Sequence, residues 1–178
     1  MLPSAELRTL IDAAAALVGL PTWEWAGESY AAGEWLEALI YVESGGNPRA
    51  VRYEPSHDVV VDGDTPGRDD GMLEDDKSYG AMQVLGSNIR RLCGVPPGTP
   101  MEFGFALLPL TNLALGLRIL TGELATVNGD VAKALARYNG GRRGSEIGPD
   151  GRMRRQQYVE RVAAASERVR RDRERSET

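Results

Sequence analysis

Glu43 is the residue in this chain whose type and position best suit acid–base chemistry. Leu36, Leu39 and Ile40 are spaced three and four apart, and the position seven after Leu36 on the same helical face is Glu43. Glycines and a proline follow within residues 44–48, so we expect Glu43 in the last turn of the helix. Partial burial and the negative end of the helix dipole both oppose ionisation of a carboxyl group there. Such a group can act as a general acid.

Position alone leaves an ordinary alternative, a surface glutamate at a helix end. The composition removes several other chemistries, because the chain has one cysteine, Cys93, and one histidine, His57. This excludes an internal disulfide and leaves no cluster for zinc and no Ser-His-Asp or Cys-His arrangement. We therefore expect no zinc site.

The chain shows no export signal and no apolar stretch of about 20 residues. We therefore expect no membrane association. The missing signal leaves two routes open, a domain of a larger secreted machine or, as we expect, delivery by a phage virion or through a holin pore.

Charge is distributed unevenly along the chain. Residues 137–178 contain 12 Arg and 7 acidic residues and so carry +5, whereas the remainder carries −10. A basic segment suits an anionic polymer such as nucleic acid or bacterial wall. The run 168–175 mixes both signs, which is typical of a solvated helix face. We expect a monomer that does not bind nucleic acid.

Apolar periodicity predicts one mostly helical domain over residues 1–178. The first helix begins after Ser4 and ends before Gly19, and the second covers residues 33–44. A short helix is expected at 87–92 with Ser87 as its cap, and another at 131–138 capped by Asp130. A longer helix is expected from Pro109, with an apolar face of Leu110, Leu113, Ala114, Leu117 and Leu120. The last helix is expected from about residue 154, with Tyr158, Val162 and Val169 packed. Residues 52–77 contain nine acids and predict a loop, with a short hairpin near 59–61.

Three further segments carry polar and aromatic side chains beside glycines. They are Ser78-Tyr79-Gly80-Ala81-Met82-Gln83-Val84, Ala136-Arg137-Tyr138-Asn139-Gly140-Gly141 and Gln157-Tyr158-Val159-Glu160-Arg161-Val162. Each alone is compatible with an ordinary turn, helix end or core aromatic residue. Their order along the chain is what gives them meaning.

Taken in order with Glu43, these segments resemble the lytic transglycosylase family, whose catalytic domain has a lysozyme-like helical fold close to goose-type lysozyme. The matching residues are Glu43-Ser44 with Asn47-Pro48, Gly80-Ala81-Met82-Gln83, Asn112 with Gly116, Tyr138-Asn139-Gly140-Gly141, and Tyr158-Val159. The resemblance spans about residues 34–163 and leaves 164–178 as a charged helical tail.

The resemblance implies cleavage of the β-1,4 bond between N-acetylmuramic acid and N-acetylglucosamine in peptidoglycan glycan strands, without a metal or a cofactor. Glu43 would protonate the glycosidic oxygen and then accept the proton of the muramic acid 6-hydroxyl, which closes a 1,6-anhydro ring. The substrate-binding residues that it implies are Ser78, Met82, Gln83, Tyr138, Asn139 and Tyr158.

Two departures from the family pattern leave alternatives open. Ala81 stands where the family commonly has Leu, and the 37 positions from Glu43 to Gly80 exceed the usual interval. The inserted carboxylates include Glu54, Asp58, Asp62, Asp64, Asp69 and Asp70. One of them positioning a water would make the protein a lysozyme-type hydrolase, and loss of chemistry would leave a wall-binding or virion structural module.

A calcium loop is not predicted in the insertion. Asp62-Gly63-Asp64 begins such a pattern, but Pro66 and Leu73 stand where calcium ligands are required.

Overall fold

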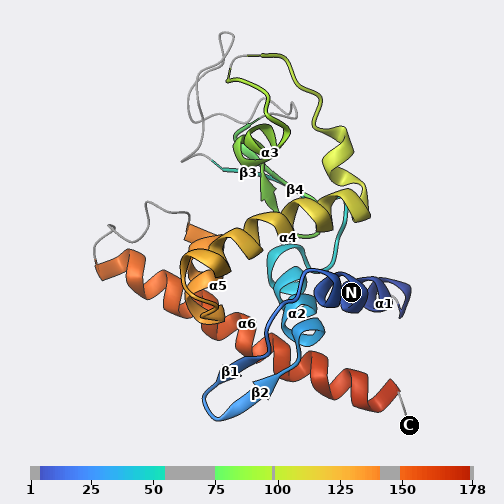
Figure 1. Cartoon of the computed structure of the whole chain (residues 1–178), viewed down its shortest axis with the longest axis vertical. Helices are drawn as coiled ribbons and strands as arrows, with labels where there is room; N and C mark the ends of the chain where they lie inside the picture. Colours follow the sequence, from blue (N-terminus) through green and yellow to red (C-terminus); the bar gives the residue numbers. More distant parts are fainter. Residues whose placement is uncertain (1–4, 55–74, 98, 141–148, 177–178) are drawn as a thin grey trace. The chain divides into compact units, whose positions relative to one another are not determined.

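The computed structural model describes residues 5–54, 75–97, 99–140 and 149–176 (Figure 1). The chain forms two compact units, residues 1–42 with 117–178, and residues 43–116. The division does not decide the expectation of a single domain, which stays a prediction. The mostly helical fold predicted from the sequence is confirmed, with small antiparallel sheets added to it.

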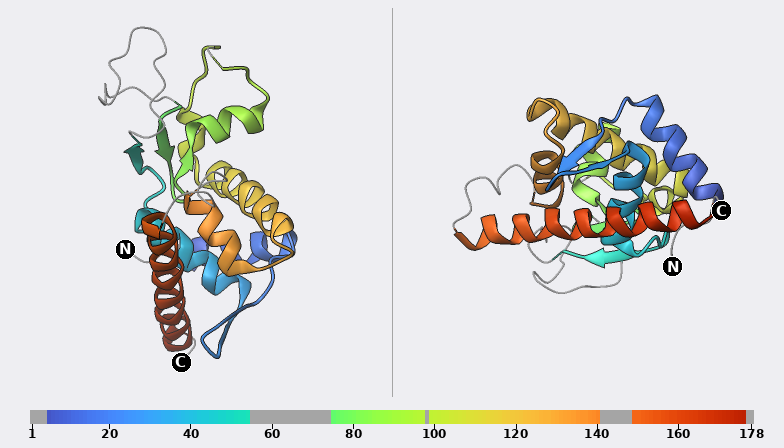
Figure 2. Two further views of the ribbon diagram at one scale, coloured as in Figure 1. Left: turned by 90° about the vertical axis from the view of Figure 1, so that its left-hand side faces the viewer. Right: turned by 90° about the horizontal axis from the view of Figure 1, so that it is seen from below.

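The first unit is built mainly from helices. Its elements are α1 (Ala5–Leu17), the hairpin β1 (Trp23–Trp25) and β2 (Glu28–Tyr30), α2 (Ala32–Ser44) up to residue 42, α4 (Pro109–Thr126) from residue 117, α5 (Val131–Gly140) and α6 (Pro149–Ser176). Helix α5 packs against α6, and β2 contacts α6 as well. Figure 2 shows α6 as one long continuous helix.

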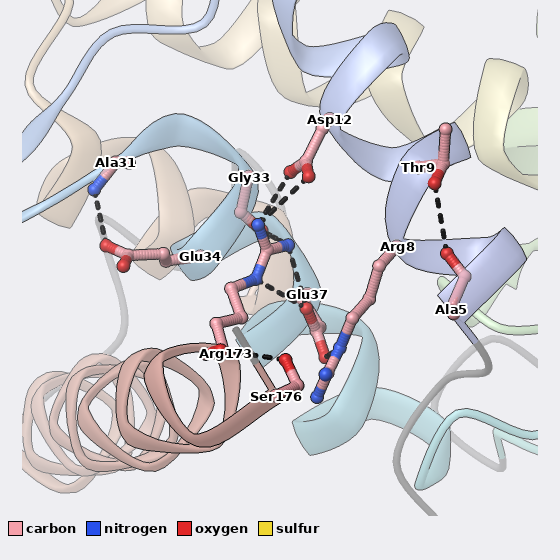
Figure 3. A network of polar contacts seen from close by, with 10 residues as sticks. All are labelled: Ala5, Arg8, Thr9, Asp12, Ala31, Gly33, Glu34, Glu37, Arg173 and Ser176. Atoms are coloured by element: carbon pink, nitrogen blue, oxygen red, sulfur yellow. Dashed lines mark hydrogen bonds and ion pairs between the residues drawn. The ribbon is translucent and has the colours of Figure 1, made fainter. Parts of the chain in front are cut away.

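The predicted face of α2 is confirmed, because Leu36, Leu39 and Ile40 are all at most 1% exposed. The same helix also buries Glu37 completely, which the apolar pattern did not predict. Arg8 and Arg173 each donate hydrogen bonds to the Glu37 carboxylate (Figure 3). These arginines lie 29 and 136 residues away in sequence, so no local pattern could reveal the pairing.

Three local expectations need correction. Ser87 does not cap its helix, because α3 (Gly86–Cys93) begins after Leu85 and has no side-chain cap, and the Ser87 N–H instead donates to Asp75 O. Leu110 is 61% exposed and Ala114 is exposed as well, so neither is part of the buried face of α4. The last helix begins at Pro149 rather than near 154. The Asp130 cap of α5 is confirmed by a 3.0 Å hydrogen bond from the Lys133 N–H.

The second unit contains a three-stranded antiparallel sheet in the order β3 (Val51–Tyr53), β4 (Lys77–Tyr79) and β5 (Val84–Leu85), followed by α3, the 3-10 helix η2 (Gly104–Leu107) and the first half of α4. Tyr79 is fully buried and stacks on Phe103, with 5.3 Å between the ring centroids. The hairpin predicted near residues 59–61 lies outside the described residues.

Candidate functional site

Glu43 lies in the last turn of α2 and is partly buried, as predicted. Gly45 and Gly46 follow with φ of 65° and 78°, a left-handed conformation that glycine adopts without steric cost and that ends the helix. The Asn47 N–H then donates to Ser44 O. The backbone therefore holds Glu43 at a defined helix end rather than in a frayed one.

The segment after Glu43 is hydrogen-bonded to the glycine-containing motif at 80–83. The Ser44 hydroxyl donates to Ala81 O at 2.8 Å. The Gly80 N–H donates to Ala50 O at 2.7 Å, and the Gln83 side-chain amide donates to the same oxygen at 3.3 Å. Two motifs far apart in the sequence thus form one piece of structure within the second unit.

Residues 80–83 are the turn that joins β4 to β5. Gly80 has a φ of 70°, and a Cβ there would lie 2.3 Å from Nδ2 of Asn112. Gln83 also has a positive φ, 47°, which is uncommon for a residue with a side chain. Its amide nitrogen donates to Gly80 O at 2.9 Å and so braces the turn.

Asn112 of α4 holds this turn from the other side. Its amide oxygen accepts from the Met82 N–H, and its amide nitrogen donates to Tyr79 O and Ala106 O. One turn further along α4, a Cβ on Gly116 would lie 2.3 Å from Sδ of Met82. Asn112 and Gly116 of the sequence pattern therefore serve the packing of the motif at 80–83.

Ser78 is buried in β4, and its hydroxyl donates to Glu54 Oε1 at 3.0 Å. Arg52, which pairs with Ser78 from the adjacent strand β3, donates to the same oxygen at 2.7 Å. Of the inserted acids named above as candidates, Glu54 is the one that lies within the described residues. The other candidate acids, Asp58, Asp62, Asp64, Asp69 and Asp70, lie outside the described residues, as does the calcium-like segment.

The first unit carries the remaining predicted site residues. Tyr138 and Asn139 stand in the last turn of α5, where Tyr138 is partly buried and Asn139 is exposed. Tyr158 of α6 is 1% exposed, and the guanidinium carbon of Arg161 lies 5.6 Å from the centre of its ring. Each unit therefore contains some of the predicted site residues.

A hollow of about 690 Å³ opens beside α5 and α6 in the first unit. It is lined by Asn139, Arg154, Gln157, Glu160, Arg161 and Ala164. Of these residues, only Asn139 is a site residue predicted from the sequence. The excess of arginine after residue 137 was a signal for Arg154 and Arg161, but the arrangement of the lining depends on the packing of α5 against α6.

Two further arginines near this part of the first unit, Arg137 and Arg155, interact with charged neighbours. Arg137 donates a hydrogen bond to Glu123, so its charge is paired. The pKa of Arg155 is lowered, first by burial and second by the charge of Arg137. The field of the arginines therefore acts across the packed helices.

The described residues contain no group of three His, Cys, Asp or Glu side chains able to hold a metal ion. Of the helices in the described part of the chain, none combines the length and the apolar character that crossing a membrane requires.

The family model described as "Transglycosylase SLT domain" matches residues 22–155 of the chain. This region contains Glu43, the turn at 80–83, and Tyr138 and Asn139, whereas Tyr158 lies just beyond it. No curated protein and no solved structure matches the chain significantly.

Proposed function

Because the chain belongs to the transglycosylase SLT domain family, whose members cleave peptidoglycan, we propose that it is a lytic transglycosylase acting through Glu43. It would cleave the β-1,4 bond between N-acetylmuramic acid and N-acetylglucosamine. The observation that supports this most is the placement of Glu43, partly buried at a helix end that is hydrogen-bonded to the turn at 80–83.

In the proposed reaction, Glu43 gives its proton to the glycosidic oxygen as the bond from that oxygen to C1 of muramic acid breaks. The N-acetyl group stabilises the oxocarbenium-like centre, so a second carboxylate is not required. The 6-hydroxyl of the same sugar then attacks C1, and its proton returns to the Glu43 carboxylate. The 1,6-anhydro ring closes without consumption of water, and Glu43 ends in its starting form.

Met82 and Gln83 would border the sugar site through the turn that they form. Met82 is fully buried, and the amide nitrogen of Gln83 is engaged by backbone oxygens. We therefore propose that both residues, together with the buried Ser78, shape the turn, and that its backbone meets the sugar.

Tyr138 and Asn139 would shape the cleft that receives the glycan strand. Asn139 is exposed, which makes its amide available to a ligand.

The test is mass spectrometry of the soluble products released from purified peptidoglycan. We expect muropeptides that end in 1,6-anhydromuramic acid. Glu43→Gln should lower the rate of release by about 10²- to 10⁴-fold, the usual contribution of a general acid. Glu102→Gln, the same substitution at an exposed glutamate of the second unit, should release product at the wild-type rate.

Three results would redirect the proposal. Reducing muramic acid ends would indicate lysozyme-type hydrolysis, and Glu54, held by Ser78 and Arg52, would then be the first candidate for positioning the water. Full activity of folded Glu43→Gln would exclude the assigned role of Glu43. Binding of glycan strands with no soluble product from the wild-type protein would indicate a silent wall-binding module.

A further inference from the structure

The hollow beside α5 and α6 carries positive charge for which a glycan strand offers no partner. Arg154 and Arg161 line it, together with Glu160. The sugars of peptidoglycan are uncharged where the lactyl carboxyl of muramic acid is joined to a peptide. The charges of this hollow therefore suggest a different part of the polymer.

The two arginines are free to receive an anion. In the described part of the chain, neither Arg154 nor Arg161 forms an ion pair, whereas Arg170 and Arg173 of the same helix do. Arg161 lies over the ring of Tyr158, a contact that orients the guanidinium without neutralising it. Both side chains can thus donate paired hydrogen bonds to a carboxylate.

The rest of the lining combines the apolar Ala164 with an acid and two amides. Glu160 supplies a negative charge, and its carboxylate accepts a 3.0 Å hydrogen bond from Gln156. Asn139 and Gln157 supply amides, which both donate and accept hydrogen bonds and so match peptide groups. The volume of about 690 Å³ is in the range of small-ligand sites.

We propose that this hollow binds the acidic stem peptide of peptidoglycan. Arg154 and Arg161 bind its carboxylates, Glu160 attracts its free amino group, and the two amides contact its backbone. The inference rests on the proposed function, because it takes peptidoglycan as the substrate. It adds a substrate class, since the protein would then prefer strands that carry peptides over strands from which the peptides have been removed.

The test is fluorescence anisotropy of a dye-labelled, soluble L-alanyl-γ-D-glutamyl-diaminopimelyl-D-alanine peptide titrated with the full chain. We expect saturable binding that weakens as salt is added. The double variant Arg154→Gln/Arg161→Gln should bind at least about tenfold more weakly. The control Arg152→Gln/Arg171→Gln removes two exposed charges from the same helix outside the hollow and should bind like the wild type.

A second measurement changes the ligand instead of the protein, so it holds even if a variant fails to fold. The same peptide with its carboxyl groups amidated should bind wild-type protein at least about tenfold more weakly. Equal binding of the two peptides, or equal affinity of the double variant and its control, would overturn the inference. So would the absence of binding up to roughly millimolar protein.

These outcomes are separate from those of the digestion experiment. Digestion of the wall without binding of the peptide would remove the inference and leave the proposed function in place. Binding of the peptide by a chain that releases no soluble product would remove the proposed activity and keep the hollow as a peptide site.

Discussion

The amide oxygen of Asn112 accepts a 2.8 Å hydrogen bond from the backbone N–H of Met82. The amide nitrogen of Asn112 donates to Tyr79 O at 2.7 Å and to Ala106 O at 3.0 Å. One fully buried side chain thus satisfies three backbone groups around the turn at 80–83. The shape of this turn, and with it the proposed sugar site, depends on an asparagine in the following helix.

Asn112→Leu should strongly destabilise the protein. It removes the three hydrogen bonds of Asn112 to backbone groups around the turn, at about 1 kcal/mol each, so we expect the free energy of unfolding to fall by about 3 kcal/mol. Urea denaturation followed by circular dichroism measures this change. Asn88→Leu, in α3 of the same unit, should change stability by less than about 1 kcal/mol, because the hydrogen bond of Asn88 with Arg91 is exposed.

Two glycines of α4 should respond oppositely to the same substitution. Gly116→Ala places a Cβ 2.3 Å from Sδ of Met82 and should lower the melting temperature. The Cβ of Gly122→Ala meets nothing within 4 Å. This variant should be more stable by about 0.5–1 kcal/mol, because alanine lowers the conformational entropy of the unfolded chain. Thermal unfolding of both variants is the measurement. An unchanged melting temperature for Gly116→Ala would show that Met82 can move aside.

Glu37 and Glu43 lie in the same helix but should differ in what their loss affects. Glu37→Gln leaves Arg8 and Arg173 without their buried partner and should lower the free energy of unfolding by about 3 kcal/mol. Glu174→Gln, at an exposed position of α6, should leave stability within about 0.5 kcal/mol of the wild type. Chemical denaturation compares them.

Glu43→Gln should show the reverse pattern, with activity lost and the unfolding curve nearly unchanged. Wild-type stability of Glu37→Gln would contradict a structural role for the buried ion pairs.

The Asp130 cap should make the stability of α5 depend on pH. Burial alone would raise the pKa of Asp130, but hydrogen bonds from the side chain and backbone of Lys133, together with its charge, lower it below the ordinary value of 3.8. A lowered folded-state pKa gives stability that is complete above pH 3.8 and is lost as the pH falls through the folded value. Asp130→Ala should cost about 1 kcal/mol at neutral pH.

Urea unfolding across pH tests this prediction. The curves of wild type and Asp130→Ala should converge at acid pH, whereas Asp130→Asn, which keeps a capping side chain without a charge, should lack this part of the pH dependence. A constant difference between wild type and Asp130→Ala at all pH values would contradict the assignment.

Local patterns in the sequence were enough to predict most helices and the position of Glu43. Periodicity identified the face of α2, and the glycines and proline after it predicted its end, because both effects act within a few residues. The same patterns wrongly predicted that Ser87 caps α3. The helix has no side-chain cap, and the backbone N–H of Ser87 donates to Asp75 O.

The tertiary structure decided the roles of residues whose partners are distant in sequence. Asn112 belonged to the predicted motif, but its hydrogen bonds to the turn at 80–83 require α4 to pack on that turn. Glu37 interrupts no apolar pattern, and only the approach of α1 and α6 supplies the arginines that allow its burial. The sequence by itself therefore determined the helices and the local position of Glu43, because these depend on neighbouring residues. The pairing of side chains that are far apart in the sequence was decided by the packing of the helices.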